Sequence, residues 1–264
     1  MRRHLPFAVF LVFFVAHPGW SQFQPASARM SFTVGAGYDQ GDFGTSDLSR
    51  ALYFPFSFRY TASQFDLSVS SSVARLSASD GVRLIDGVPT PTGGVRSFRE
   101  TGLGDTVFRS RLFLVNDRGP GTSTPSITPF FRLKLPTAPE QRGLGTGRVD
   151  YGFGVELEKD LGPAFIFGDL GYTVVGKIPG IGLQNRTLAS AGAGKQLSDT
   201  VSVSSMLDWR KSIVAGSPDA AELVGVLSYR VNSTTISPNA YVGLTAGSSD
   251  FGLGIQLRFR FGGK

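Results

Sequence analysis

The sequence contains no cysteine, and its only two histidines, His4 and His17, both precede residue 29. Without cysteine, no disulfide framework can hold the chain together. Without a later histidine, the rest of the chain cannot form a Ser–His or Cys–His nucleophilic pair, and it lacks the usual ligands of zinc and haem. These absences argue against an enzyme of those classes and against a resident metal or cofactor.

The sequence also lacks an apolar run long enough to cross a membrane as a helix, which needs roughly 20 residues. The apolar run Leu5–Ala16 follows two arginines and precedes a proline, a glycine and small residues. This arrangement is typical of a secretory signal peptide. We expect residues 1–28 to be that peptide, cleaved after Ser21 or Ala28, and residues 29–264 to form one exported domain.

Charge of one sign is present only in modest excess. The formal net charge is +6 and the basic residues are scattered, so the sequence predicts no nucleic-acid partner. Arginine outnumbers lysine, which suits fixed charge in a confined channel. A GC-rich genome would produce the same bias, and the composition leaves both explanations open.

What the sequence does contain is strict alternation of apolar and polar residues, most clearly near its C-terminus. Successive side chains of a strand point to opposite faces, so such a segment has one apolar face and one small, polar and basic face. One parity of this segment holds Phe251, Leu253, Ile255, Leu257, Phe259 and Phe261, and the other holds Gly252, Gly254, Gln256, Arg258 and Arg260.

The same alternation recurs along the chain, and no sustained 3.6-residue period occurs. The seventh segment is apolar on both faces apart from Asp169 and Thr173, so its register stays open. The predicted strands are, approximately, 32–39, 52–61, 65–78, 101–115, 127–135, 149–158, 164–176, 187–197, 201–210, 221–230, 235–246 and 251–261.

The connections between these strands alternate between long and short. The long ones are Gln40–Arg50, Ser79–Glu100, Pro139–Gly147 and Lys177–Arg186. Long extracellular loops and short periplasmic turns are typical of outer-membrane barrels, whereas a soluble two-sheet sandwich is the alternative. The sequence favours an all-β fold, a single antiparallel transmembrane β-barrel of outer-membrane type with about twelve strands. We expect it in the cell outer membrane.

Charged residues lie on the polar parity of several predicted strands. Neighbouring strands would bring opposite charges together as a ladder of ion pairs. Such a ladder is either a constriction that selects solutes or a charged plug that keeps a narrow barrel rigid, and its near neutrality favours the plug. The candidates for lumen lining or selectivity are Asp105, Arg109, Arg111, Arg132, Lys134, Asp150, Glu156, Glu158, Arg258 and Arg260.

None of these residues is predicted to be catalytic. Glu156 and Glu158 could in principle act as an acid–base pair. Two carboxylates on one face of a strand are, however, more typical of lumen lining. The Gly-x-Gly strings have no following helix, so they do not predict a dinucleotide site. We therefore expect neither catalytic residues nor a metal or cofactor.

Three short strings occur in a fixed order. They are Gly-Leu-Gly-Asp at 102–105, Lys-Leu-Pro-Thr at 134–137 and Leu-Gly-Thr-Gly at 144–147, followed by Asp150. In these strings the chain resembles the outer-membrane β-barrel family of phenol meta-pathway degradation proteins. The resemblance implies a barrel that moves small apolar or aromatic solutes and is not an enzyme. Ala138 stands where that family usually has glycine.

The expected partners are outer-membrane lipid, the barrel-assembly machinery through the C-terminal strand, and a small apolar or aromatic solute. Three residues follow Phe261, whereas many outer-membrane proteins end on the aromatic residue of the last strand. The alternative function is a non-transporting structural or surface-binding barrel. The long Ser79–Glu100 loop motivates that alternative.

Overall fold

A computed structural model describes residues 29–41, 48–78, 82–85, 88–91, 98–139, 142, 144–178 and 182–262. The predicted signal peptide lies outside these ranges. Among the residues that are described, no helix is long and apolar enough to cross a membrane. The strands are β1 Arg29–Gly41, β2 Ser49–Thr61, β3 Phe65–Ala78, β4 Val82–Ile85, β5 Val88–Pro91, β6 Phe98–Leu103, β7 Thr106–Leu112, β8 Ser126–Leu135, β9 Asp150–Asp160, β10 Ala164–Val174, β11 Arg186–Gln196, β12 Val201–Arg210, β13 Ala220–Val231, β14 Thr234–Gly243 and β15 Phe251–Phe261.

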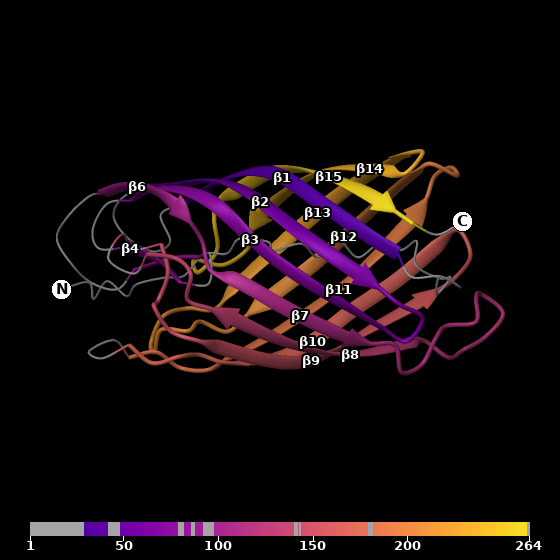
Figure 1. Ribbon diagram of the computed structural model, residues 1–264, viewed down its shortest axis with the longest axis horizontal. Helices are drawn as coiled ribbons and strands as arrows, with labels where there is room; N and C mark the ends of the chain where they lie inside the picture. Colours follow the sequence, from indigo (N-terminus) through magenta and orange to yellow (C-terminus); the bar gives the residue numbers. More distant parts are fainter. Residues whose placement is uncertain are drawn as a thin grey trace.

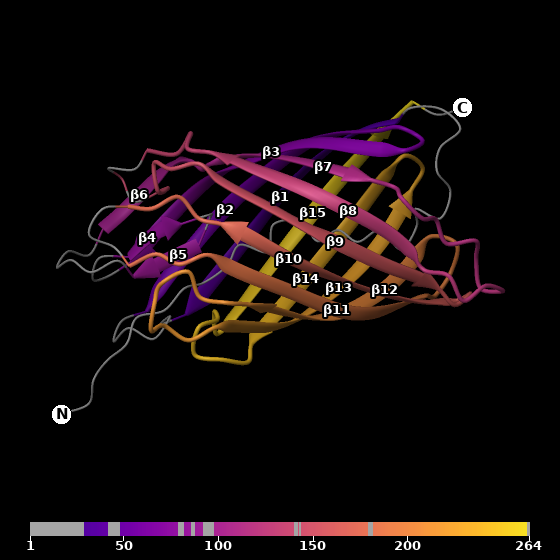
Figure 2. The same cartoon turned by 90° about the horizontal axis from the view of Figure 1, so that it is seen from below.

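These strands form a closed antiparallel barrel (Figure 1). β1 pairs with β2 on one side and with β15 on the other, which closes the sheet. β6 and β7 both pair with β3 and together make one wall strand. The wall therefore has twelve strands, as the sequence predicts. β4 and β5 form a separate hairpin near the β6 end of the barrel (Figure 2).

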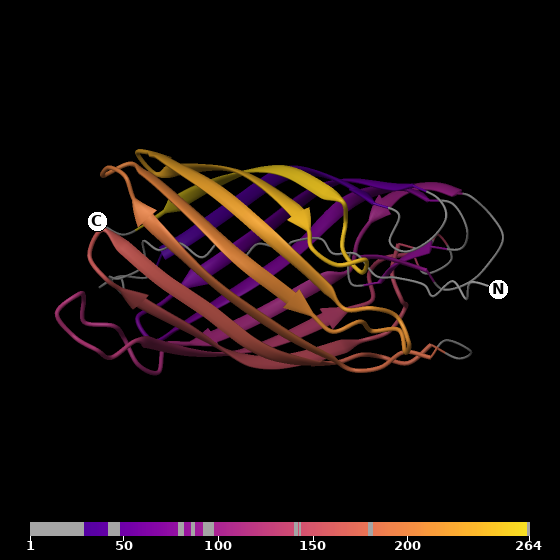
Figure 3. The ribbon, with the colours of Figure 1, turned by 180° about the vertical axis from the view of Figure 1, so that it is seen from behind.

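The start of β1 and the end of β15 lie at one end of the barrel, because Met30 of β1 faces Phe261 of β15. We call this the terminal end and the opposite one the loop end. Figure 3 shows the wall from the side opposite to that in Figure 1. β15 pairs with β1 along its whole length, including Phe32 to Tyr38. Most turns at the terminal end are short. In the β13–β14 turn, Asn232 has φ 53°, a left-handed conformation that asparagine tolerates.

The apolar parity of the strands points outward. In β15, Leu253 and Phe261 are each 54% exposed, whereas Gly252 on the other parity is buried. Exposed large apolar side chains occur on every side of the wall, and the described residues include no second sheet that covers them. A closed barrel with such a surface matches a lipid environment. The sandwich alternative is wrong.

The wall strand made of β6 and β7 contains a bulge. Ser71 and Ser72 of β3 lie opposite three residues, Gly104, Asp105 and Thr106. The Gly104 N–H donates to the Ser72 carbonyl (2.7 Å), and the Ser71 hydroxyl donates to the Gly104 carbonyl (3.3 Å). The extra residue switches the parity, so that Asp105 points inward together with the β7 arginines. The strand predicted over 101–115 therefore corresponds to β6 and β7 with this bulge between them, and it runs from Phe98 to Leu112.

Candidate functional site in the barrel lumen

Lys134 forms the centre of a first ionic cluster inside the barrel. Its Nζ lies 3.3 Å from Asp105 Oδ2 and 2.7 Å from Asp150 Oδ2, and donates to the Thr146 hydroxyl at 3.0 Å. The Lys134 side chain is 0% exposed. The β7 bulge supplies one carboxylate, and the first residue of β9 supplies the other. The cluster therefore joins the wall to the loop that connects β8 and β9.

Glu156 forms the centre of a second ionic cluster. Its Oε1 lies 2.5 Å from Arg109 Nη2, and its Oε2 lies 3.0 Å from Arg111 Nη1. Arg111 also pairs with both carboxylate oxygens of Asp66, and Arg59 Nη1 lies 3.8 Å from Asp66 Oδ2. The sequence analysis did not include Asp66 and Arg59 among the candidates. Extending the inward parity along β2 and β3 would have found both.

The other four predicted lumen residues are Arg132, Glu158, Arg258 and Arg260. Arg132 of β8 lies directly opposite Arg109 in the sheet. Glu158 Oε1 is buried and has no hydrogen-bond partner among the described residues. Arg258 and Arg260 lie on the inward parity of β15, and no ion pair within the described ranges joins them to either cluster. The role of all ten residues in selectivity stays a prediction.

A third buried ion pair lies at the loop end of the inner wall. Arg210 of β12 pairs with Glu222 of β13, and its Nε lies 3.1 Å from Asp208 Oδ2. The Ser249 hydroxyl donates to Glu222 Oε1 at 3.2 Å. Like the Lys134 cluster, this pair connects the wall to a loop-end segment. Within the described chain, no group of acidic, histidine or cysteine side chains could hold a metal ion.

An apolar strip crosses the inner wall between β10 and β14. We define it as Phe165, Phe167, Met206, Val224 and Tyr241, all less than 9% exposed, with Val226 packed against them. The two phenylalanine rings stack at 6.0 Å between centroids. The strip was not predicted from the sequence. β10 is apolar on both faces, so its inner face could not be identified from the pattern of apolar and polar residues.

The phenylalanines of the strip lie over two glycines of β11. Gly192 is opposite Phe167, and Gly194 is opposite Phe165. A Cβ atom at either glycine would overlap the facing ring. The glycines that the sequence placed on the inward parity of this strand therefore leave room for aromatic rings. This complementarity was the signal that could have fixed the register of β10.

The apolar strip runs obliquely along the inner wall of the barrel. Phe167, Gly192, Met206, Val224 and Tyr241 are successive cross-strand neighbours. Because strands tilt against the axis of a barrel, a row of such neighbours rises along the wall. The row begins near the terminal end of β10 and reaches the loop end of β14. Figure 2 shows the tilt of these strands.

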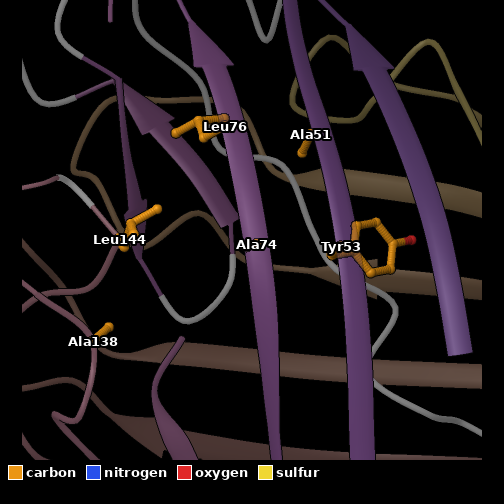
Figure 4. Packing of buried hydrophobic residues seen from close by; sticks show 6 residues of the cluster. All are labelled: Ala51, Tyr53, Ala74, Leu76, Ala138 and Leu144. Carbon is orange, nitrogen blue, oxygen red and sulfur yellow. The ribbon is translucent and has the colours of Figure 1, made fainter. Parts of the chain in front are cut away.

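A second apolar group, which we call the mouth cluster, lies at the loop end. It consists of Ala51, Tyr53, Ala74, Leu76, Ala138 and Leu144 (Figure 4). The first four belong to the inner face of β2 and β3, and the last two belong to the β8–β9 loop. Leu144 is only 1% exposed. The sequence predicted this part of the loop only as a connection between strands. In the structure, the loop packs against the inner wall.

The mouth cluster and the apolar strip meet at two tyrosines. The Tyr53 and Tyr241 hydroxyl oxygens are 3.5 Å apart, and the Tyr53 hydroxyl donates to Asp39 Oδ1 at 3.3 Å. The two apolar groups are thus joined through the polar ends of two tyrosines. The paired charges of the Glu156 cluster occupy another sector of the wall, on β2, β3, β7 and β9.

A clasp at the terminal end holds the long β7–β8 turn. Asp117 Oδ1 accepts hydrogen bonds from Lys159 Nζ (2.6 Å) and the Gly119 N–H (3.0 Å), and Oδ2 accepts one from the Asp160 N–H (2.6 Å). Burial raises the pKa of the Asp117 carboxyl, but these hydrogen bonds and the Lys159 charge outweigh burial, so the pKa lies below its usual value. The carboxylate therefore stabilises the turn in its ionised form.

Replacing Asp117 by asparagine is expected to lower the free energy of unfolding at pH 7 by about 1–3 kcal/mol, since charged hydrogen bonds are lost. A carboxyl group whose pKa is lower in the folded protein stabilises the fold at pH values above its unfolded pKa of about 3.9. This stabilisation is lost as the pH falls through the folded pKa. The difference between wild type and variant, followed by thermal unfolding, should therefore vanish at the lowest pH. The exposed Asp199→Asn is the control, and a pH-independent difference would contradict the prediction.

No protein-family model and no curated protein matches the sequence. Solved structures do match. An outer membrane channel from Pseudomonas putida F1 has a TM-score of 0.65 at 13% identity, over 92% of this chain and 99% of that one. The translocator domain of the autotransporter NalP from Neisseria meningitidis has a TM-score of 0.52 at 9% identity, over 89% of this chain and 88% of that one.

The KdgM porin is also similar, with a TM-score of 0.51 at 11% identity, over 88% of this chain and 99% of the porin. At these identities the likeness establishes the fold alone. The chain has the fold of an outer-membrane-type β-barrel.

Proposed function

We propose that the protein is a channel of the cell outer membrane for small apolar or aromatic solutes, and that it has no enzymatic activity. The observation that carries the proposal is the apolar strip, which rises along the inner wall from Phe165 to Tyr241 and meets the mouth cluster. The resemblance of the Gly-Leu-Gly-Asp, Lys-Leu-Pro-Thr and Leu-Gly-Thr-Gly strings to phenol meta-pathway degradation proteins supports the same solute class.

An apolar strip favours such solutes through the hydrophobic effect. Each 40 Å² of apolar surface that leaves water contributes about 1 kcal/mol. Phe167, Met206 and Val224 are 8%, 4% and 1% exposed, so a planar aromatic molecule contacts them only when the lumen side chains that cover them move aside. The Glu156 cluster holds three arginines and two carboxylates, so it offers a polar wall with a small positive excess beside the strip.

Reconstitution of the purified protein tests the proposal directly. Planar-bilayer recording would detect an open pore, and proteoliposomes would report the uptake of toluene, benzoate and a sugar of similar size. We expect faster entry of the aromatic solutes than of the sugar. The absence of both conductance and solute uptake would contradict the proposal. Membrane fractionation tests the location, and recovery in the soluble periplasm would overturn it.

The double variant Met206→Gln/Val224→Thr is expected to slow aromatic uptake about tenfold, because both changes keep the side-chain size similar and replace apolar contact worth about 1.4 kcal/mol. Uptake in proteoliposomes measures the effect. Ser228→Thr is the control, since it lies on the same inner face outside the apolar strip and keeps its hydroxyl for Ser237. Equal uptake by the double variant and the control would count against a role of the strip.

The alternative is a non-transporting barrel, and the mouth cluster is the observation that favours it. Leu144 and Ala138 fill space at the loop end, and the Lys134 cluster holds their loop in place. The Ser79–Glu100 loop, which motivates surface binding, lies partly outside the described residues. Conductance that stays absent even after the loop is released would support this alternative.

The proposed partners of the barrel are outer-membrane lipid and the barrel-assembly machinery. The exposed apolar parity of the wall supports the first. For the second, the support is that β15 forms the closing strand and pairs with β1 along its whole length. Deletion of the last residues of β15 should reduce the amount of assembled protein in the membrane.

A further inference from the structure

Three arginines occupy the outward face of the barrel at the loop end. Arg50 lies near the start of β2, Arg75 near the end of β3 and Arg99 near the start of β6, and all three are exposed. They share the outward parity of the lipid-facing residues Leu52, Val73 and Leu103 on the same strands. We call these three side chains the rim arginines.

The sheet register brings the rim arginines close together. Ser77 of β3 lies directly opposite Arg50 of β2 and directly opposite Arg99 of β6. Strands are about 4.8 Å apart, so the Cα atoms of Arg50 and Arg99 are about 10 Å apart, and Arg75 lies about 7 Å along β3 from Ser77. Arginine side chains are long enough for all three guanidinium groups to converge on one ligand.

The rim arginines carry positive charge that the described part of the chain does not neutralise. Arg50 Nε donates to the neutral Gln40 side chain at 3.4 Å. Among the described residues, no carboxylate forms an ion pair with any of the three. This contrasts with the lumen, where Lys134, Arg109, Arg111 and Arg210 are all paired. A group of unpaired guanidinium ions is a site for an anion.

The position of the rim arginines specifies the kind of anion. Directly below them on the same face lie Leu52, Val73 and Leu103, each about two-fifths exposed at 38%, 40% and 42%. These residues belong to the apolar band that faces lipid, so the arginines lie where that band gives way to headgroups. A ligand that reaches them must extend along the lipid-facing surface.

The rest of the outward rim differs in character. At the loop end of β9, β10, β14 and β15, the outward residues are apolar or aromatic, namely Val149, Tyr151, Tyr172, Val242 and Phe251. Other exposed bases, such as Arg148 and Lys211, lie at the loop end beside separate strands, whereas the β2–β3–β6 sector brings three bases together. A localised group of positive charges indicates a specific site, whereas a uniform ring would indicate only general attraction to the membrane surface.

We propose that Arg50, Arg75 and Arg99 bind the phosphate groups of an anionic glycolipid in the membrane leaflet at the loop end. Guanidinium groups bind phosphate through paired, charge-assisted hydrogen bonds. The acyl chains of the same lipid would contact the exposed Leu52, Val73 and Leu103 below. The site lies outside the lumen and does not depend on what the barrel transports.

Titration with a phosphorylated glycolipid tests the site. The purified full-length barrel in neutral detergent would be titrated with bis-phosphorylated lipid A, with binding followed by native mass spectrometry. Each lost arginine is expected to weaken binding about fivefold, so Arg50→Gln/Arg75→Gln/Arg99→Gln should bind about 100-fold more weakly. Lys195→Gln is the matched control, because Lys195 is an exposed, outward-facing base near the terminal end. It should bind like wild type.

Two further comparisons make the proposal falsifiable. Lipid A without phosphate should bind wild type as weakly as bis-phosphorylated lipid A binds the triple variant, and inorganic phosphate alone should not compete at equal concentration. Arg→Lys at all three positions should restore part of the affinity. Equal binding of phosphorylated and dephosphorylated lipid, full competition by inorganic phosphate, or wild-type affinity of a correctly folded triple variant would each overturn the site. Solute uptake by the triple variant should equal that of wild type, which separates this test from that of the channel.

Discussion

Replacing Lys134 by alanine is expected to destabilise the barrel by about 3–5 kcal/mol, the largest effect of a single substitution that we predict. The substitution leaves the carboxylates of Asp105 and Asp150 buried without their shared cation, and it removes the hydrogen bond to Thr146. Two buried carboxylates near each other would also repel. The destabilisation therefore combines lost attraction with uncompensated burial of charge.

Heat-modifiability on SDS gels and thermal unfolding in detergent both measure this effect. Lys195→Ala removes a lysine of the same length from the exposed outward face of β11, and it should leave the unfolding midpoint unchanged. The triple variant Lys134→Met/Asp105→Asn/Asp150→Asn should recover most of the stability, since no charge is then buried without a partner. A stable Lys134→Ala variant would show that the cluster does not hold the fold.

Replacing Leu144 by alanine is expected to release the β8–β9 loop from the lumen and to increase single-channel conductance. Leu144 is 1% exposed and packs against the inner faces of β2 and β3. Truncation of a buried leucine costs about 2–5 kcal/mol of packing free energy. The loop therefore loses a large contact with the inner wall. The remaining contacts of the loop with the wall include the Lys134 cluster, Ala138 and the hydrogen bonds of Thr137 to Gly104 and Thr106.

Planar-bilayer recording of Leu144→Ala measures the change, and limited proteolysis of the loop gives an independent readout. Leu114→Ala is the control, because Leu114 lies in the β7–β8 turn and is 62% exposed. Its conductance should equal that of wild type. If Leu144→Ala also conducts like wild type while its loop becomes accessible to protease, the loop does not limit the pore. The proposed gain in conductance would then be wrong.

Both predictions concern the loop between β8 and β9. Lys134 binds Thr146 in that loop, and Leu144 packs two residues before it. A Lys134→Ala variant that remains folded should therefore also show increased conductance. The charged cluster thus has two effects at once, since it stabilises the wall and holds the loop at the mouth.

The sequence by itself determined the class of fold. Alternation with a period of two is a local property, and it survives in segments such as Phe251–Phe261 without reference to any neighbour. The alternation of long and short connections then favoured a membrane barrel over a sandwich. The inward parity of Asp105, Arg109 and Arg111 also followed from the sequence, although the bulge that turns Leu103 of β6 to the outward face did not.

The tertiary structure decided what the lumen contains. The register of β10 could not be determined locally, because Phe165, Phe167 and their neighbours are apolar on both parities. Only pairing with the glycines of β11 shows which side is inner. Three features each join residues that are far apart in the sequence. They are the apolar strip, the packing of Leu144 against β2 and β3, and the Asp66–Arg111 ion pair. Such contacts depend on the tilt and closure of the whole sheet, which no local period of the sequence records.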